Sequence, residues 1–129
     1  MDTKVIAKIY DAAFKVVGCS RLSETCQIGG VGAALLTEKG NIYTGICVDL
    51  SSSMGYCAER AAAAEMLKNR ESVIKMVVAV DWNGKILPPC GFCREFMLQL
   101  NEKNTGTLVV LGKEKVLRLA KLMPFRWKA

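Results

Sequence analysis

Hydrophobic side chains near the N-terminus recur at the spacing of a helix. Between residues 3 and 17 they fall near one helical face, Thr3 can cap the start of this helix and Gly18 can end it. We therefore expect a first helix that packs one face against the rest of the protein.

The pattern then changes to that of strands. After a polar stretch over residues 20–24, apolar runs at 31–36 and 42–48 flank a segment that contains Gly40. A glycine between two apolar runs is typical of a β-hairpin turn. Two antiparallel strands are therefore expected after the first helix.

The second half of the chain is expected to alternate helices with strands, with a helix over residues 57–67, a buried central strand over 73–80, a helix over 90–101, a strand over 107–111 and a last element over 115–119. The two prolines before Cys90 delay the third helix until that residue. The last element fits either a paired strand or a short helix. This order predicts one mixed sheet sandwiched by helices.

Length and composition agree with one folded domain over residues 1–129. The mass is 14.1 kDa, and 51% hydrophobic with 23% charged residues excludes a disordered or collagen-like chain. The longest apolar run lies within residues 76–80, whereas a membrane-spanning helix needs roughly 20 apolar residues. Because the N-terminus also lacks the pattern of a signal peptide, we expect a soluble, cytoplasmic protein without a membrane partner.

The formal net charge of +6 is concentrated at one end of the chain. The whole excess lies beyond residue 102, where the chain has one acidic residue, Glu114. The basic residues in this segment are Lys103, Lys113, Lys115, Arg118, Lys121, Arg126 and Lys128. These side chains could form a footprint for a polyanion or only a solvated face. Because no ladder of stacking aromatic residues accompanies them, we do not expect a nucleic-acid partner.

Histidine is absent and cysteine is abundant, which narrows the possible chemistry. Without histidine there is no imidazole base, no His-based triad and no His metal ligand. The six cysteines stand at positions 19, 26, 47, 57, 90 and 93. In a chain without an export signal the thiols stay reduced, and a close Cys-x-x-Cys pair then indicates a metal-binding or redox-active site.

Three of these cysteines lie at the starts of predicted helices. A helix N-terminus favours thiolate over thiol, which suits metal ligation. Cys90 and Cys93 can converge on one ion, and Cys57 can complete the set if its helix end faces theirs. Three thiolates suit zinc best, and a site with three protein ligands keeps a position for water, whose pKa zinc lowers to about 7 in catalytic sites.

Glu59 follows Cys57 by two residues, so its carboxylate can reach the open coordination position. There it would act as a proton shuttle, delivering protons to a ring nitrogen and to a departing amine. Alternatively, it is only a favourable acidic residue in a first helical turn. The two cysteine motifs together favour the catalytic role.

The segments Cys-Ala-Glu-Arg at 57–60 and Pro-Cys-Gly-Phe-Cys-Arg-Glu at 89–95 resemble the small, three-cysteine cytidine deaminase family, which includes blasticidin S deaminases. Residues 31–36, 43–45 and 122–124 resemble further family segments in the same order. The resemblance implies a cytidine deaminase-like α/β fold, a three-layer α-β-α sandwich with one mixed sheet of about five strands.

The resemblance also implies an activity. It is the zinc-dependent hydrolytic deamination of a cytosine-type nucleoside to the uracil form and ammonia, with one zinc ion per chain held by Cys57, Cys90 and Cys93, and with Glu59 as the catalytic residue. Arg60 is placed to donate hydrogen bonds to ligand sulfurs and to offset their charge, although it could be only an exposed helix arginine. Family members of this length are homotetramers with shared active sites.

Substrate-binding residues are expected at Cys47, Asp49, Ala58 and Trp127. Cys47 and Asp49 match the Asn and Glu that hold ribose in the family, although Cys47 could be only a buried small hydrophobe. A family Phe that packs on the pyrimidine matches Gly29, and Trp127 lies near the position of a pocket Phe. We therefore expect weaker binding of ordinary nucleosides, and a tail that covers the pocket of a neighbouring chain.

Three other functions remain open from the sequence. The missing Asn and Phe favour a deaminase of aminoacylnucleoside antibiotics of the blasticidin S type. A nucleic-acid base deaminase would explain the basic C-terminal end, but base flipping needs loops for which 129 residues leave little room. A non-catalytic binding module would instead hold a structural zinc through the three motif cysteines and Cys47.

Overall fold

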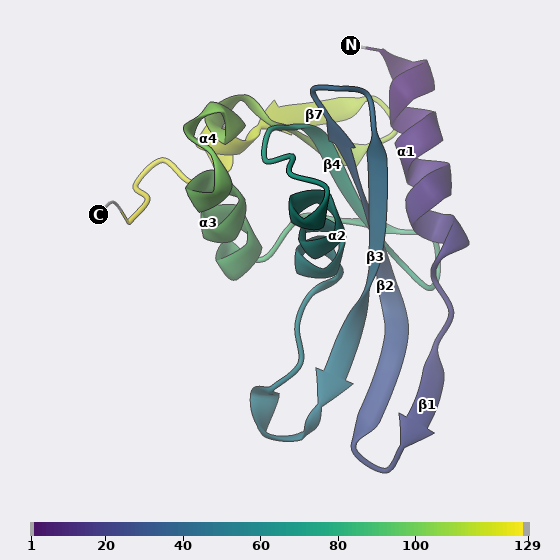
Figure 1. Cartoon of the computed structure of the whole chain (residues 1–129). Coiled ribbons are helices and arrows are strands. Elements are labelled where there is room, and N and C mark those ends of the chain that lie inside the picture. Colours follow the sequence, from purple (N-terminus) through teal and green to yellow (C-terminus); the bar gives the residue numbers. More distant parts are fainter. Residues whose placement is uncertain (1, 128–129) are drawn as a thin grey trace.

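The computed structural model describes residues 2–127 of the protein (Figure 1). In chain order, its helices, strands and 3-10 helices (η) are α1 (Thr3–Lys15), β1 (Ser20–Ser23), β2 (Cys26–Thr37), β3 (Ile42–Leu50), η1 (Ser51–Ser53), α2 (Ala58–Lys68), β4 (Ile74–Asp81), β5 (Ile86–Leu87), α3 (Gly91–Leu100), η2 (Glu102–Gly106), β6 (Leu108–Gly112), β7 (Lys115–Arg118) and α4 (Leu119–Leu122).

The strands form one mixed sheet, as predicted. Within the described residues the sheet has seven strands in the order β1-β2-β4-β6-β7, with β3 also paired to β2 and β5 to β4. Strands β4 and β6 run parallel, and the other pairs run antiparallel. The two short strands β1 and β5 extend the predicted sheet of about five strands.

Strand β1 lies in the polar stretch whose pattern indicates no regular element. All of its residues are exposed, and backbone pairing with β2, such as Ser20 opposite Ile28, holds it in place. A strand that buries neither face leaves no alternation of polar and apolar residues in the sequence. Its existence therefore depends on the neighbouring strand.

Helices cover both faces of the sheet, as predicted. Helix α1 lies on one face, and α2 and α3 lie on the other (Figure 1). Successive residues of β2 and β4 pack on opposite faces of the sheet. Ala34 and Val78 pack with α1, whereas Leu35 and Val77 pack with α2 and α3. Strand β4 is thus a central strand covered on both faces, and the structure is a three-layer α-β-α sandwich.

Close packing places α2, the helix that carries the first motif, directly on β3. A Cβ atom on Gly45 of β3 would overlap with the backbone of α2 at Ala58 and Ala62. Ala62 and Ala63 are fully buried, so the predicted contact between the alanine-rich helix and the sheet is confirmed. Because the residues on both sides of this contact are small, α2 and its N-terminus lie close to β3.

The N-terminal cap of α1 differs from the prediction. Asp2 rather than Thr3 is the cap, because its Oδ1 accepts hydrogen bonds from the backbone N–H groups of Lys4 and Val5 at 3.0 and 3.3 Å. A carboxylate here also interacts favourably with the helix dipole. No helix within residues 2–127 is long and apolar enough to cross a membrane.

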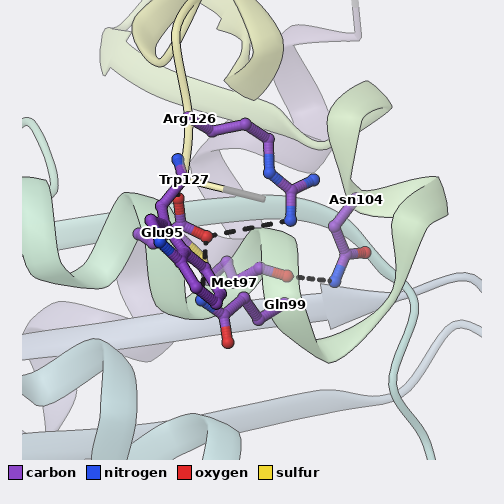
Figure 2. A network of polar contacts seen from close by, with 6 residues as sticks. All are labelled: Glu95, Met97, Gln99, Asn104, Arg126 and Trp127. Carbon is purple, nitrogen blue, oxygen red and sulfur yellow. Dashed lines mark hydrogen bonds and ion pairs between the residues drawn. The ribbon is translucent and has the colours of Figure 1, made fainter. Parts of the chain in front are cut away.

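The C-terminal segment combines both predicted alternatives, since strand β7 runs to Arg118 and α4 begins at Leu119. The tail beyond α4 is attached to α3 through Glu95 (Figure 2). The Glu95 carboxylate accepts a hydrogen bond from the Trp127 backbone N–H at 3.0 Å and lies 3.7 Å from an Arg126 Nη atom. Lys128, which contributes to the basic excess, lies outside the described residues.

Candidate active site and metal centre

The three motif cysteines come together where the N-termini of α2 and α3 meet. Cys57 is the N-cap residue of α2, Cys90 is the N-cap residue of α3, and Cys93 lies in the first turn of α3. Their Sγ atoms all lie within 4.8 Å of one another, and those of Cys57 and Cys90 are 3.6 Å apart. The predicted convergence of the two helix ends is present in the structure.

This spacing fits a zinc ion. Tetrahedral coordination with Zn–S bonds of about 2.3 Å places two ligand sulfurs about 3.8 Å apart. The spacing of 3.6 Å between Cys57 and Cys90 agrees with this value, the third sulfur lies within 4.8 Å of both, and three soft thiolates are ligands that zinc prefers. The cluster can therefore hold zinc without a large rearrangement.

A cation–π contact and two hydrogen bonds hold the two helix ends in position. The Arg60 guanidinium of α2 lies 4.0 Å above the Phe92 ring of α3, a cation–π contact that joins the two ends. Arg94 donates hydrogen bonds to the carbonyl groups of Pro89 and Leu122 at 2.8 and 3.0 Å. The Cys90 loop is thereby fixed between α3 and the C-terminal segment.

The thiols of the cluster differ in acidity. Burial raises the pKa of Cys93, and the nearby Glu59 carboxylate raises it further. Burial also raises the pKa of Cys57. Burial acts in the same direction on Cys90, but hydrogen bonds from the Cys93 backbone N–H and the Cys57 thiol outweigh it and lower the pKa. Cys90 is therefore the thiol most ready to bind a cation as a thiolate.

Glu59 has the environment of a carboxyl group that can carry a proton. Its side chain is only 5% exposed and lines a cavity together with Cys57 and Cys90. Burial raises the pKa of Glu59, while a backbone hydrogen bond and the charge of Arg60 oppose this shift. The carboxyl group thus lies beside the sulfur cluster in a site from which most water is excluded.

The site consists of an inner and an outer cavity. The inner cavity has a volume of about 170 Å³, and its walls include Glu59, Ala58 and three cysteines, two of which, Cys57 and Cys90, belong to the sulfur cluster. The outer cavity has a volume of about 430 Å³, and its walls include Asp49, Arg60 and Trp82. Val31, Cys47 and Cys57 line both cavities, so the two adjoin.

Cys47 lies at this junction rather than in the sulfur cluster. Its Sγ accepts a hydrogen bond from the Val31 backbone N–H at 3.2 Å. Among residues 2–127, the group of potential metal ligands consists of Cys57, Cys90 and Cys93 and does not include Cys47. This geometry does not support the binding module with four sulfur ligands.

Gly29 has no room for the aromatic side chain that the family carries at the matching position. Its backbone φ is +84°, and a Cβ atom there would overlap with the carbonyl group of Gly18. Gly29 is also buried and does not line either cavity. An aromatic side chain therefore cannot occupy this position, because the backbone of Gly18 takes up the space.

Trp127 lies apart from the two cavities of its own chain. Its backbone is bound to Glu95 on α3, and its side chain is 65% exposed (Figure 2). In a single chain it lines neither the inner nor the outer cavity. Its predicted contact with substrate therefore requires a neighbouring chain.

The structure also brings residues to the site that the sequence did not single out. Val31 and Leu87 add apolar walls to the inner cavity, and Tyr56 and Trp82 line the outer one. Trp82 gives a usable signal, since a large aromatic residue directly follows a buried central strand. The other three give none, because only the fold brings them together.

Comparison with known proteins places the chain in a family. The model of the cytidine and deoxycytidylate deaminase zinc-binding region matches residues 6–109. The chain belongs to this family. The predicted family, fold class and zinc cofactor are therefore confirmed, and the protein belongs to the hydrolases that act on C–N bonds.

Individual relatives agree with this assignment. A probable cytidine deaminase of Dictyostelium discoideum is 39% identical over 74 residues, which are 56% of this chain and 50% of the relative. The cytidine deaminase of Mycobacterium tuberculosis (strain ATCC 25618 / H37Rv) is 32% identical over 95 residues, 73% of this chain and 69% of the relative. The matches thus span half to about two thirds of these relatives.

Solved structures extend the similarity to nearly the whole chain. A mutant cytidine deaminase of Mycobacterium tuberculosis superposes with a TM-score of 0.80 at 25% identity, covering 96% of this chain and 95% of the other. The cytidine deaminase of Burkholderia pseudomallei has a TM-score of 0.73 at 28% identity and covers 98% and 100%. The sheet and its helices are therefore those of cytidine deaminases.

Proposed function

We propose that the protein hydrolyses the exocyclic amine of a cytosine-type nucleoside, giving the uracil form and ammonia. The observation that carries this proposal is the buried Glu59 carboxyl beside three clustered cysteines at the end of a small inner cavity. Such a cavity suits one ring, and the adjoining outer cavity has room for the rest of a nucleoside.

Cys57, Cys90 and Cys93 would hold the zinc ion. When bound, zinc supplies a Lewis acid that makes a water molecule acidic near neutral pH. Glu59 would carry the protons of the reaction, first to the ring nitrogen next to the reacting carbon and then to the departing amine. Its burial supports this role, because burial raises the pKa of the carboxyl group and so makes it a better proton acceptor than an exposed glutamate.

Arg60 would offset the negative charge of three thiolates. In the described part of the chain its Nε is buried and has no hydrogen-bond partner, so this donor is available to a ligand sulfur. The same side chain stacks on Phe92, which holds it near the cluster. Replacing Arg60 by Gln should therefore weaken zinc retention, which competition with a chelator measures.

The substrate would be held by the walls around the junction of the cavities. Ala58 and Cys47 would contact the ring, and the exposed Asp49 carboxylate would accept a hydrogen bond from a hydroxyl of the N1 substituent. A carboxylate at this place also disfavours a phosphate group by like-charge repulsion. We therefore propose a nucleoside rather than a nucleotide as the substrate.

The direct test is ammonia release from purified, zinc-loaded protein. We expect turnover of cytidine or deoxycytidine, with 5-methylcytidine, cytosine and the corresponding monophosphates as comparisons. Preference for a monophosphate would contradict the role of Asp49. Release from none of these compounds, with zinc bound, would contradict the proposed activity.

A blasticidin S-type substrate is the second candidate. The side-chain amide expected for ribose is replaced by the Cys47 thiol, and the outer cavity of about 430 Å³ leaves space for a substituent larger than ribose. The Asp49 carboxylate could pair with a cationic group on such a substituent. Faster deamination of blasticidin S than of cytidine in the same assay would favour this candidate.

We further propose a homotetramer with active sites completed by neighbouring chains. Phe92, Phe125 and Trp127 are large hydrophobic residues that are exposed in the single chain. Aromatic residues are enriched in interface cores, so these residues are suited to contact a neighbour. Light scattering should give about four times 14.1 kDa, and Trp127→Ala should weaken substrate binding without removing zinc. A fully active monomer would contradict this assembly.

Two further sequence predictions stay proposals. We infer that residues 1–129 form one domain, which a single cooperative unfolding transition would support. We also infer a cytoplasmic location, because thiolates that bind zinc need a reducing compartment. Fractionation of cells that express the protein tests the location, and recovery in an oxidising compartment would contradict it.

A further inference from the structure

We propose that Trp82 is a specificity-determining residue whose indole ring forms the wall against which the N1 substituent of the substrate packs. This inference rests on the proposed function, because it places the cytosine ring in the inner cavity. Trp82 follows strand β4 directly, lines the outer cavity and is 61% exposed. A large, accessible aromatic surface therefore borders the space outside the inner cavity.

The strand register explains how Trp82 comes to this place. Strands β2 and β4 are antiparallel, and Val31 pairs with Asp81. The next positions outward are Gly30 and Trp82, so the tryptophan stands opposite a residue without a side chain. A Cβ atom built on Gly30 would lie 3.9 Å from Cε3 of Trp82 and 3.9 Å from the Cys47 sulfur. The indole and the Cys47 thiol thus both lie next to Gly30.

Strand β2 contains no aromatic residue. Gly29 has a positive φ, and a Cβ atom there would overlap with the Gly18 backbone, so this position accepts no side chain. Gly30 lines the outer cavity without a side chain. Trp82, which directly follows the adjacent strand β4, is therefore placed to provide the apolar contact that β2 lacks.

The sizes of the cavities decide which part of the substrate meets Trp82. The reacting ring must reach Glu59 and the cysteines, which border the inner cavity of about 170 Å³. This volume lies below the range of about 300–1,000 Å³ typical of whole ligand sites, so the N1 substituent must extend into the outer cavity. Trp82 lines the outer cavity and not the inner one.

A purely structural role is the competing explanation. An aromatic side chain opposite a glycine on a neighbouring strand can stabilise a sheet by covering the exposed backbone. In that case, substitution of Trp82 would lower thermal stability without a selective effect on substrates. The two explanations therefore differ in the Michaelis constant for substrates with and without an N1 substituent.

The test compares zinc-loaded parent, Trp82→Ala and Trp82→Phe with cytidine and with free cytosine. Trp82→Ala should raise the KM for cytidine about tenfold, the loss of one aromatic contact, and leave kcat within about twofold. Activity on free cytosine should not change, and Trp82→Phe should restore most of the cytidine affinity. An unchanged KM for cytidine, or equal losses for cytidine and cytosine, would overturn the proposal.

A fluorescence titration keeps this result separate from the proposed activity. The chain has two tryptophans, Trp82 and Trp127, so the difference between the emission of the parent and that of Trp82→Phe reports on Trp82 alone. Cytidine should change its emission saturably, and free cytosine should change it much less. If the parent releases no ammonia from any cytosine compound, the proposed activity fails, while this titration still decides whether Trp82 contacts a nucleoside. No change with cytidine would overturn the contact.

Discussion

The inner and outer halves of the site are built in different ways. The inner half consists of three cysteines and Glu59 at the N-termini of α2 and α3, where local helix geometry fixes each side chain. The outer half is formed near the ends of β2, β3 and β4 by Gly30 on β2, Cys47 on β3 and Trp82, which directly follows β4. One half depends on spacing along the chain and the other on the register between strands.

This difference determines how each half responds to change. Zinc chemistry restricts the inner residues to particular types, because the ligands must be thiolates and the proton carrier must be a carboxyl group. The outer walls need only shape and a few polar groups, so several residue types can serve. Substitutions in the inner half should therefore remove the reaction, and those in the outer half should alter substrate choice or stability.

The largest effect is expected at Cys90. Cys90→Ala should lose zinc, destabilise the helix ends around it and abolish activity together, because a metal ligand also contributes to folding. Cys26→Ala is the matched control, since Cys26 lies on β2 outside the sulfur cluster and should leave zinc unchanged. Zinc content by atomic emission, together with thermal unfolding, measures both. Full zinc occupancy in Cys90→Ala would show that the cluster is not the metal site.

The next effect is expected at Glu59. Glu59→Gln should leave folding and zinc content intact and lower turnover at least about a hundredfold, because the amide cannot carry the proton. Steady-state ammonia release and zinc analysis of the same preparation measure it. If a zinc-replete Glu59→Gln protein keeps parental turnover, Glu59 has no part in the mechanism.

A comparison of two glycines tests the packing of β2 beside the outer half of the site. Gly29 and Gly40 both have positive φ values, +84° and +87°, but only at Gly29 would a Cβ atom overlap with another part of the chain. Gly40→Ala should lower the free energy of unfolding by about 1 kcal/mol through backbone strain. Gly29→Ala should lower it by about 3 kcal/mol or more, because Gly18 must also move. Urea unfolding measures both, and equal losses would show that Gly18 does not restrict this position.

The smallest effect is expected far from the site, at the pair of Tyr43 and Glu71. A hydrogen bond from the Tyr43 hydroxyl is the main cause that lowers the pKa of Glu71 below its ordinary value of 4.5, with Thr37 and Asn41 adding to it. Because the folded pKa is depressed, this carboxylate stabilises the protein above about pH 4.5, and the stabilisation is lost as the pH falls through the folded pKa.

Tyr43→Phe should therefore lower stability near neutral pH and reduce the loss of stability between pH 7 and pH 3. Urea unfolding of Tyr43→Phe and the parent across this range measures the difference. Activity and zinc content should not change, since Tyr43 lines neither cavity. Identical pH profiles would show that this hydrogen bond does not shift the Glu71 pKa.

The inner half of the site and the main elements could be predicted because their signals are local. A Cys-Ala-Glu segment and a Pro-Cys-x-x-Cys segment at helix starts specify both position and chemistry, and the apolar run of β4 specifies a central strand. The resemblance to the family, rather than a local motif, pointed to Cys47 and Asp49, which the structure places in the walls of the outer cavity.

The rest of the outer half could not be predicted because its determinants lie far apart in the sequence. The constraint on Gly29 comes from the backbone of Gly18, and the position of Trp82 depends on its register with Gly30. Strand β1 buries no side chains, so it has no hydrophobic pattern. Each of these features appears only when strands pair.

The central claim is that three sulfurs hold a zinc ion and leave one position for the reaction. Zinc X-ray absorption spectroscopy on the purified, zinc-loaded protein tests it most directly. The sulfur cluster of Cys57, Cys90 and Cys93 predicts three sulfur ligands at about 2.3 Å and one oxygen or nitrogen ligand, with one zinc per chain. Four sulfur ligands would instead make Cys47 a ligand, close the site and contradict the proposed catalysis.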